Sequence, residues 1–203
     1  NDFAPNDFLY SQQGHHAVIG SEAAWDITRG DNSIIISIVD AGFDLTHPDF
    51  QNIAGAGWNK VYSPFDFSGM DANPLGSNHG VESSGIAAAN GDNAEGISGV
   101  AQNCVLLPVQ YPSGSDLNYS DMYVWIGGFD PHSTRAGFPA RISPGADVIG
   151  NSFGIYQAAI SGIMKDTFDY LTSYGRNGKG CVIVYSVGND NLDFNDGNGG
   201  FGR

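Results

Sequence analysis

The chain has 203 residues, with 22 acidic and 8 basic side chains and a formal net charge of −14 at pH 7. This length suits one domain with a sizeable core, and the negative charge argues against nucleic acid as a partner. No stretch is long and apolar enough to cross a membrane as a helix, so we expect no membrane partner. Because the sequence opens at Asn1 and not at Met, we expect a leader or pro-segment to have been removed.

Apolar runs and helical patterns alternate along the chain. A short helix capped by Ser21 precedes the first run. The runs at 34–39 and 105–110, the one ending at Ile149, and the one at 182–187 predict strands, with a further short strand near 53–58. Helices are predicted over 79–89, 120–126 and 158–174, the last ended by Gly175. This alternation predicts an α/β fold with a doubly wound parallel sheet.

Polar residues stand where three of these strands end. The first strand stops at Asp40, the third leads into Asn151-Ser152, and the last is followed by Gly188-Asn189. Open α/β sheets place their chemistry at the carboxyl ends of the strands. We therefore expect these side chains to meet at one edge of the sheet.

Five short segments, in the same order as in the family, resemble the subtilisin-like serine proteases over essentially the whole chain. Residues 38–50 (IVDAGFDLTHPDF) resemble the segment of the catalytic aspartate, and Asn78-His79-Gly80 with 85–88 resembles the histidine segment. The other three are the turn at 96–101, the cleft-lining segment at 151–154 and the oxyanion segment at 187–189. Residues 6–13 and 175–180 are most similar to the kexin and furin branch and its bacterial relatives.

The resemblance implies a serine endopeptidase acting on polypeptides. Asp40 would orient His79, His79 would act as general base, and Asn189 would stabilise the oxyanion. A threonine follows the His-Gly pair in most of the family, whereas this chain has Val81 followed by Glu82-Ser83-Ser84. The resemblance also implies two substrate-binding segments, Ser113-Gly114-Ser115 and Ser152-Phe153-Gly154.

No segment resembles the one that carries the family's nucleophilic serine, so we interpret residues 1–203 as the N-terminal portion of the catalytic domain. We expect a separate C-terminal fragment, produced by a nick in the Gly/Asn/Asp-rich tail at 191–203, to supply the serine. This chain alone would then be inactive. A pro-segment, inhibitor or chaperone is a further expected partner, and the family resemblance favours secretion.

Structural Ca²⁺ is the expected cofactor. By resemblance, side chains of Asp7, Asp49 and Asn93 would bind the ion, with the backbone carbonyls of Ala89, Glu95 and Ile97. Hard Ca²⁺ takes six to eight oxygen ligands, which suits the oxygen-rich turn over 90–97.

Two alternatives remain open from the residues. The first is a catalytically dead binding fragment that keeps Asp40 and His79 but has no nucleophile. The second is a metal-dependent hydrolase using Asp40, Asp44, His47 and His79. The two cysteines, Cys104 and Cys181, border apolar runs and are predicted to be small buried residues.

Overall fold

The computed structural model describes residues 3–131, 137–154 and 160–189. Its centre is a five-stranded parallel sheet in the order β2-β3-β1-β4-β5, which confirms the predicted α/β class. The strands are β1 Ile35–Asp40, β2 Phe65–Asp66, β3 Val105–Gln110, β4 Val148–Asn151 and β5 Val182–Tyr185. The helices are α1 His15–Ile19, α2 Ser21–Trp25, α3 Asn78–Ala88, α4 Asp116–Ile126 and α5 Gly162–Gly178, with 3₁₀ turns at Tyr10–Gln12 and Pro48–Phe50.

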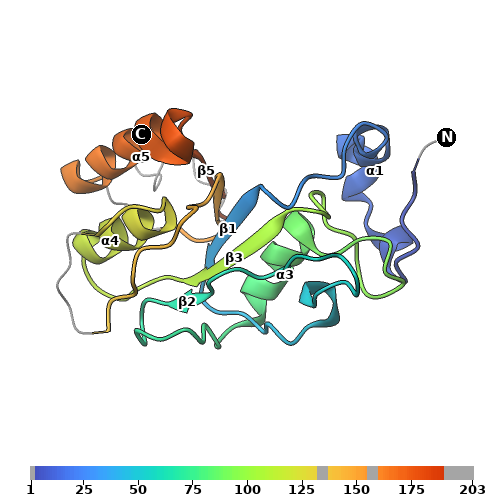
Figure 1. Ribbon diagram of the computed structural model, residues 1–203, viewed down its shortest axis with the longest axis horizontal. Helices are drawn as coiled ribbons and strands as arrows, with labels where there is room; N and C mark the ends of the chain where they lie inside the picture. Colours follow the sequence, from blue (N-terminus) through green and yellow to red (C-terminus); the bar gives the residue numbers. More distant parts are fainter. Residues whose placement is uncertain (1–2, 132–136, 155–159, 190–203) are drawn as a thin grey trace.

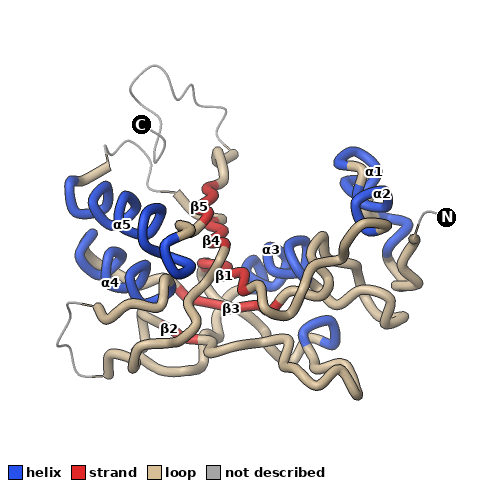
Figure 2. Tube along the Cα trace, turned by 45° about the horizontal axis from the view of Figure 1, so that its top comes forward, coloured by secondary structure: helices blue, strands red, loops and turns tan. Residues whose placement is uncertain are grey.

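Helices cover both faces of the sheet. In Figures 1 and 2, α4 and α5 lie together on one side and α3 lies on the other, while α1 and α2 stand at the far end beside the N-terminus. The larger apolar cluster lies under α4 and α5 and includes Val39, Leu107 and Trp125. The smaller one lies under α3 and includes Ile38 and Phe43. Because β1 is buried on both faces, its apolar run does not alternate.

Helix α3 packs closely against the sheet because its inner face is made of small residues. Gly80, Ser84, Gly85 and Ala88 are all buried. Helix α3 spans Asn78–Ala88, which confirms the predicted helix over 79–89 to within a residue at each end. Its amino end, which carries His79, lies beside the carboxyl end of β1.

Several boundaries differ from the prediction. Residues 53–58 form a loop and not a strand; the short strand of this region is β2, which pairs with β3 through Phe65 and Asp66. Ser21 lies inside α2 and the cap position is Gly20; the Ser21 hydroxyl instead bonds the buried His16 ring at 2.8 Å. Helix α4 begins at Asp116, four residues earlier than predicted.

The predicted end of the long helix is confirmed, because the backbone leaves helical geometry at Gly175. Cys104 and Cys181 are both buried and free, as predicted. Among the described residues, no helix combines the length and apolarity that crossing a membrane requires.

Candidate active site

Asp40 and His79 form a direct contact, although they are 39 residues apart in the sequence. Asp40 is the last residue of β1, and Nδ1 of His79 lies 2.9 Å from each of its carboxylate oxygens. The Asp40 side chain is 2% exposed and the His79 side chain 56% exposed. A buried carboxylate thus holds one edge of an imidazole whose opposite edge, with Nε2, is open to an incoming group.

The local backbone explains why the histidine reaches this strand end. Ser77 caps α3 by accepting the His79 amide at 3.1 Å. A Cβ atom at Gly80 would lie 2.2 Å from the Gly42 carbonyl oxygen, so only glycine allows this approach. Gly42 itself has a φ of 143°, a value that side chains disfavour. These two glycines let α3 dock against the turn that follows Asp40.

Two further donors complete the surroundings of the Asp40 carboxylate. The backbone amide of Ala41 donates to Oδ1 at 2.7 Å, and the Ser83 hydroxyl donates to Oδ2 at 3.1 Å. Burying a carboxylate without such partners would be costly. In the sequence, Ser83 stands out only as part of a departure from the family pattern. Its position one helical turn after His79 was the signal that could have placed it at Asp40.

The two expected substrate segments leave the sheet on either side of Asp40. Strands β3 and β4 flank β1, with Asp40 opposite Gln110 and Val39 opposite Asn151. Residues 113–115 follow β3 and residues 152–154 follow β4. Both segments therefore emerge at the edge of the sheet where the Asp40–His79 pair lies.

Phe153 is the one member of these segments whose ring packs inward. It lies against Tyr111 and Tyr119, with ring centroids 4.8 and 5.9 Å away. Ser113, Gly114 and Ser115 connect β3 to α4, and Gly114 has a left-handed φ of 105°. Binding of substrate by either segment stays a prediction.

Asn189 is exposed and follows β5, which β4 separates from β1. Within the described ranges, no hydrogen bond joins its side chain to Asp40 or His79. Its oxyanion role therefore stays a prediction.

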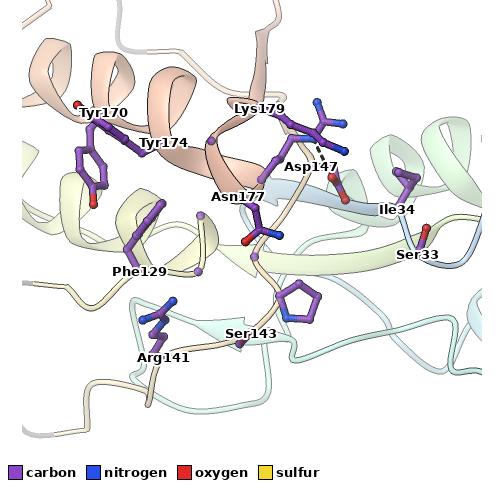
Figure 3. Close-up of a pocket in the computed structure, with 16 residues that line it drawn as sticks. Ser33, Ile34, Phe129, Arg141, Ser143, Asp147, Tyr170, Tyr174, Asn177 and Lys179 are labelled. Atoms are coloured by element: carbon purple, nitrogen blue, oxygen red, sulfur yellow. Dashed lines mark hydrogen bonds and ion pairs between the residues drawn. The ribbon is translucent and has the colours of Figure 1, made fainter.

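One hollow lies at the opposite edge of the sheet. It has a volume of about 660 Å³, and its lining includes Ile34 and Asp147, which immediately precede β1 and β4. Figure 3 shows Arg141, Asp147 and Asn177 among the side chains that line it. Asp147 forms an ion pair with Arg176, with 2.8 Å between Oδ1 and Nε. Neither Asp40 nor His79 lines this hollow. This hollow is therefore separate from the Asp40–His79 pair, which lies where the carboxyl end of β1 meets the amino end of α3.

The residues of the expected calcium site do come together. Asp7 is 5% and Asp49 0% exposed, and Asp49 accepts hydrogen bonds from the Asn93 side chain at 3.2 Å and the Ile97 amide at 3.0 Å. Burial raises the pKa of Asp7, and the nearby charge of Asp49 raises it further. Oδ1 of Asp7 is buried with no partner among the described residues.

Of the other two predicted ligands, Ala89 immediately precedes the 90–97 turn and Glu95 lies within it. The Ala89 carbonyl accepts the Gly99 amide at 3.3 Å, and the Glu95 amide donates to the Asn93 side chain at 3.0 Å. The buried carboxylates of Asp7 and Asp49 repel each other, and Oδ1 of Asp7 has no partner among the described residues, so this arrangement is suited to binding a cation. No group of three or more His, Cys, Asp or Glu side chains that could hold a metal occurs in the described ranges.

The absence of such a metal-binding group among the described residues also tests the alternative of a metal-dependent hydrolase. Asp44 accepts hydrogen bonds from Thr46, and Nδ1 of His47 accepts the Asp49 amide at 3.2 Å. In the described part of the molecule these two side chains do not join Asp40 and His79 in a metal-binding cluster. The structure therefore gives this alternative no support.

Comparison with known proteins agrees with this geometry. Residues 31–200 match the model of the Subtilase family, peptidase group S8, and the chain belongs to this family. A thermophilic serine proteinase of Bacillus sp. (strain AK1) is 31% identical over 195 residues, covering 93% of this chain and 41% of the relative. A calcium-dependent protease of Trichormus variabilis is 30% identical over 188 residues, covering 84% and 25%. The chain thus spans less than half the length of these relatives.

A solved protease of Pseudoalteromonas arctica PAMC 21717 has the same fold, with a TM-score of 0.74 and 24% identity over 93% of this chain and 60% of that one. Proprotein convertase subtilisin/kexin type 6 of Rattus norvegicus is 25% identical over 187 residues, covering 83% of this chain and 17% of the relative. The kexin branch is therefore represented among the relatives, at lower identity than the bacterial proteinase.

Proposed function

We propose that residues 1–203 form the N-terminal portion of a subtilisin-like catalytic domain that hydrolyses peptide bonds through an Asp-His-Ser triad. Asp40 and His79 are two members, and a C-terminal fragment of the same protease supplies the serine. The observation that carries this proposal is the contact of Nδ1 of His79 with both oxygens of the buried Asp40 carboxylate.

The chemistry of His79 depends on which ring nitrogen carries the proton. A proton on Nδ1 directed at Asp40 leaves Nε2 to take the proton of the attacking serine, and the carboxylate stabilises the imidazolium that forms. Asn189 would donate its amide to the developing oxyanion. A polypeptide substrate would lie extended between segments 113–115 and 152–154, pairing with them as an added strand.

The serines close to the pair already have other roles. Ser83 donates to Asp40, and Ser77 accepts the His79 amide as the cap of α3. Among the described residues, neither hydroxyl is hydrogen-bonded to the imidazole ring of His79. A nucleophile from another polypeptide segment is therefore the simplest way to complete the triad.

The side of β4 and β5 facing the α3 layer offers a docking surface for that segment. Val182 and Val184 are 49% and 53% exposed, and Val148, opposite Val182, packs with the cluster under α3. These three side chains lie on one face because side chains alternate along strands. A helix packed here would lie beside the amino end of α3, where His79 stands.

The test is labelling with a serine-directed fluorophosphonate probe after co-expression of this chain with the C-terminal portion of its own precursor. We expect the probe to label the C-terminal fragment, and His79→Ala to abolish labelling. Intact-mass analysis under denaturing conditions should find both chains. A correctly assembled complex that is never labelled would instead support the catalytically dead alternative.

Calcium is the proposed structural ion, held by the side chains of Asp7, Asp49 and Asn93 with carbonyls of Ala89, Glu95 and Ile97. The Trichormus relative's name, calcium-dependent protease, supports this assignment, as do the two buried carboxylates. Calcium should raise the unfolding temperature of the wild-type chain at pH 7, and magnesium should not. Asp49→Asn should lose that response, whereas an exposed control, Asp31→Asn, should keep it.

Secretion and a folding partner complete the proposal. A relative of Natrialba magadii, 36% identical over 108 residues, is named an extracellular serine protease. A fold neighbour, the Aeromonas sobria serine protease, was solved in complex with a chaperone, with a TM-score of 0.54. We expect a pro-segment or chaperone to assist assembly, and refolding yields with and without the precursor's N-terminal segment would test this.

A further inference from the structure

Ser83 lies one helical turn after His79 and shares its target. Residues four apart on a helix project from the same face, and both side chains here reach the carboxylate of Asp40. We propose that Ser83 is a positioning residue that fixes the plane of the Asp40 carboxylate against Nδ1 of His79. This inference rests on the proposed function of the Asp40–His79 pair, and it deepens that function.

Each carboxylate oxygen of Asp40 accepts its own hydrogen bond. Oδ1 accepts the Ala41 amide at 2.7 Å, and Oδ2 accepts the Ser83 hydroxyl at 3.1 Å. Nδ1 of His79 lies 2.9 Å from both oxygens. Each oxygen therefore has one donor of its own and shares the imidazole. With one donor on each side, rotation of the carboxylate would break a hydrogen bond in either direction.

Only one of these two donors can be removed by mutation. The Ala41 amide belongs to the backbone and is present whatever residue stands there. Ser83 is the side chain that holds Oδ2, and within the described ranges that oxygen would keep only His79 if the hydroxyl were removed. Asp40 is buried, so water cannot readily replace the lost donor.

The neighbouring serine provides a matched control. Ser84 is 1% exposed, and its hydroxyl oxygen is buried without a partner among the described residues. Ser84→Ala removes the same atom from the same helix, with no change at Asp40. Ser83→Thr keeps a hydroxyl and serves as the conservative variant.

The first readout is the NMR resonance of the Nδ1 proton of His79 in the 203-residue chain, which needs no nucleophile. Ser83→Ala should shift this resonance upfield, because a carboxylate free to rotate makes a weaker hydrogen bond. Ser84→Ala should leave it unchanged and Ser83→Thr should restore it. Equal spectra for the two alanine variants, or no recovery in the threonine variant, would overturn the proposal.

The second readout is peptidase kinetics in the assembled two-chain complex. Loss of one hydrogen bond to a charged group predicts about a ten- to hundredfold lower kcat for Ser83→Ala, with KM unchanged. A rise in KM at constant kcat would also contradict the positioning role. If the wild-type complex shows no peptidase activity, the proposed function fails, and the NMR comparison still decides the role of Ser83.

Discussion

Lys60 makes the stability of this fold depend on pH in a calculable way. Its side chain is 1% exposed, and Nζ donates to the carbonyls of Gln102 and Cys104 at 2.8 and 2.9 Å. Burial lowers the pKa of Lys60 to about 7, against about 10.4 for an unfolded lysine. Lys60→Met removes the titrating group and leaves an unbranched side chain that is one heavy atom shorter.

The sign of this pH dependence follows from the number of protons that the folded and unfolded chains bind. Between the folded and unfolded pKa values, the unfolded chain binds the extra proton, so the free energy of unfolding rises with pH. Below pH 6 Lys60 is protonated in both states and contributes no slope. Integrating from pH 7 to 8.5 gives a contribution of about 1.5 kcal/mol. The free energy of unfolding of wild type minus that of Lys60→Met should increase by this amount.

Urea denaturation at pH 6, 7, 8 and 8.5 measures that difference, provided the m-value is constant. Stopping at pH 8.5 avoids the thiol of Cys181, whose pKa burial raises to about 11. Lys165→Met is the control, because Lys165 is exposed and titrates above this range in both states. A flat difference curve between pH 7 and 8.5, or one that falls, would show that the pKa of Lys60 is not lowered in the folded chain.

Three further changes have defined outcomes. Gly80→Ala would place a Cβ atom 2.2 Å from the Gly42 carbonyl oxygen, so it should cost about 1–3 kcal/mol of unfolding free energy; a loss below about 0.5 kcal/mol by urea denaturation would contradict this close approach. Asp40→Asn should lower kcat of the two-chain complex by about 10⁴-fold in peptide hydrolysis, because an amide does not hold His79 in the working tautomer; an unchanged kcat would refute the triad. Cys181 is 5% exposed, so iodoacetamide should modify it only after unfolding, and rapid labelling of the native chain, seen by mass spectrometry, would contradict its burial.

The strands that local sequence predicted correctly are those with long apolar runs. β1 and β3 are six-residue strands buried on both faces, and short apolar runs rich in Val and Ile between helical patterns are typical of such strands. The prediction failed in the loop after β1. Residues 53–58 lack a strand, and β2 exists only because Phe65 and Asp66 pair with the edge of β3. That pairing is a long-range contact that no local pattern indicates.

The sequence by itself determined the fold class, the family and the identity of the pair at the candidate site, because these depend on short segments and on strand-helix alternation. Tertiary structure decided that Nδ1 of His79 meets both oxygens of Asp40 and that Ser83 holds one of them. It also brought Asp7 against the 90–97 turn. The physical reason is that these contacts need separate segments to approach within hydrogen-bonding distance. The sequence shows that residue 80 is glycine, but only the structure shows that the Gly42 carbonyl lies where its Cβ atom would be. Strand register is likewise not specified by any local pattern.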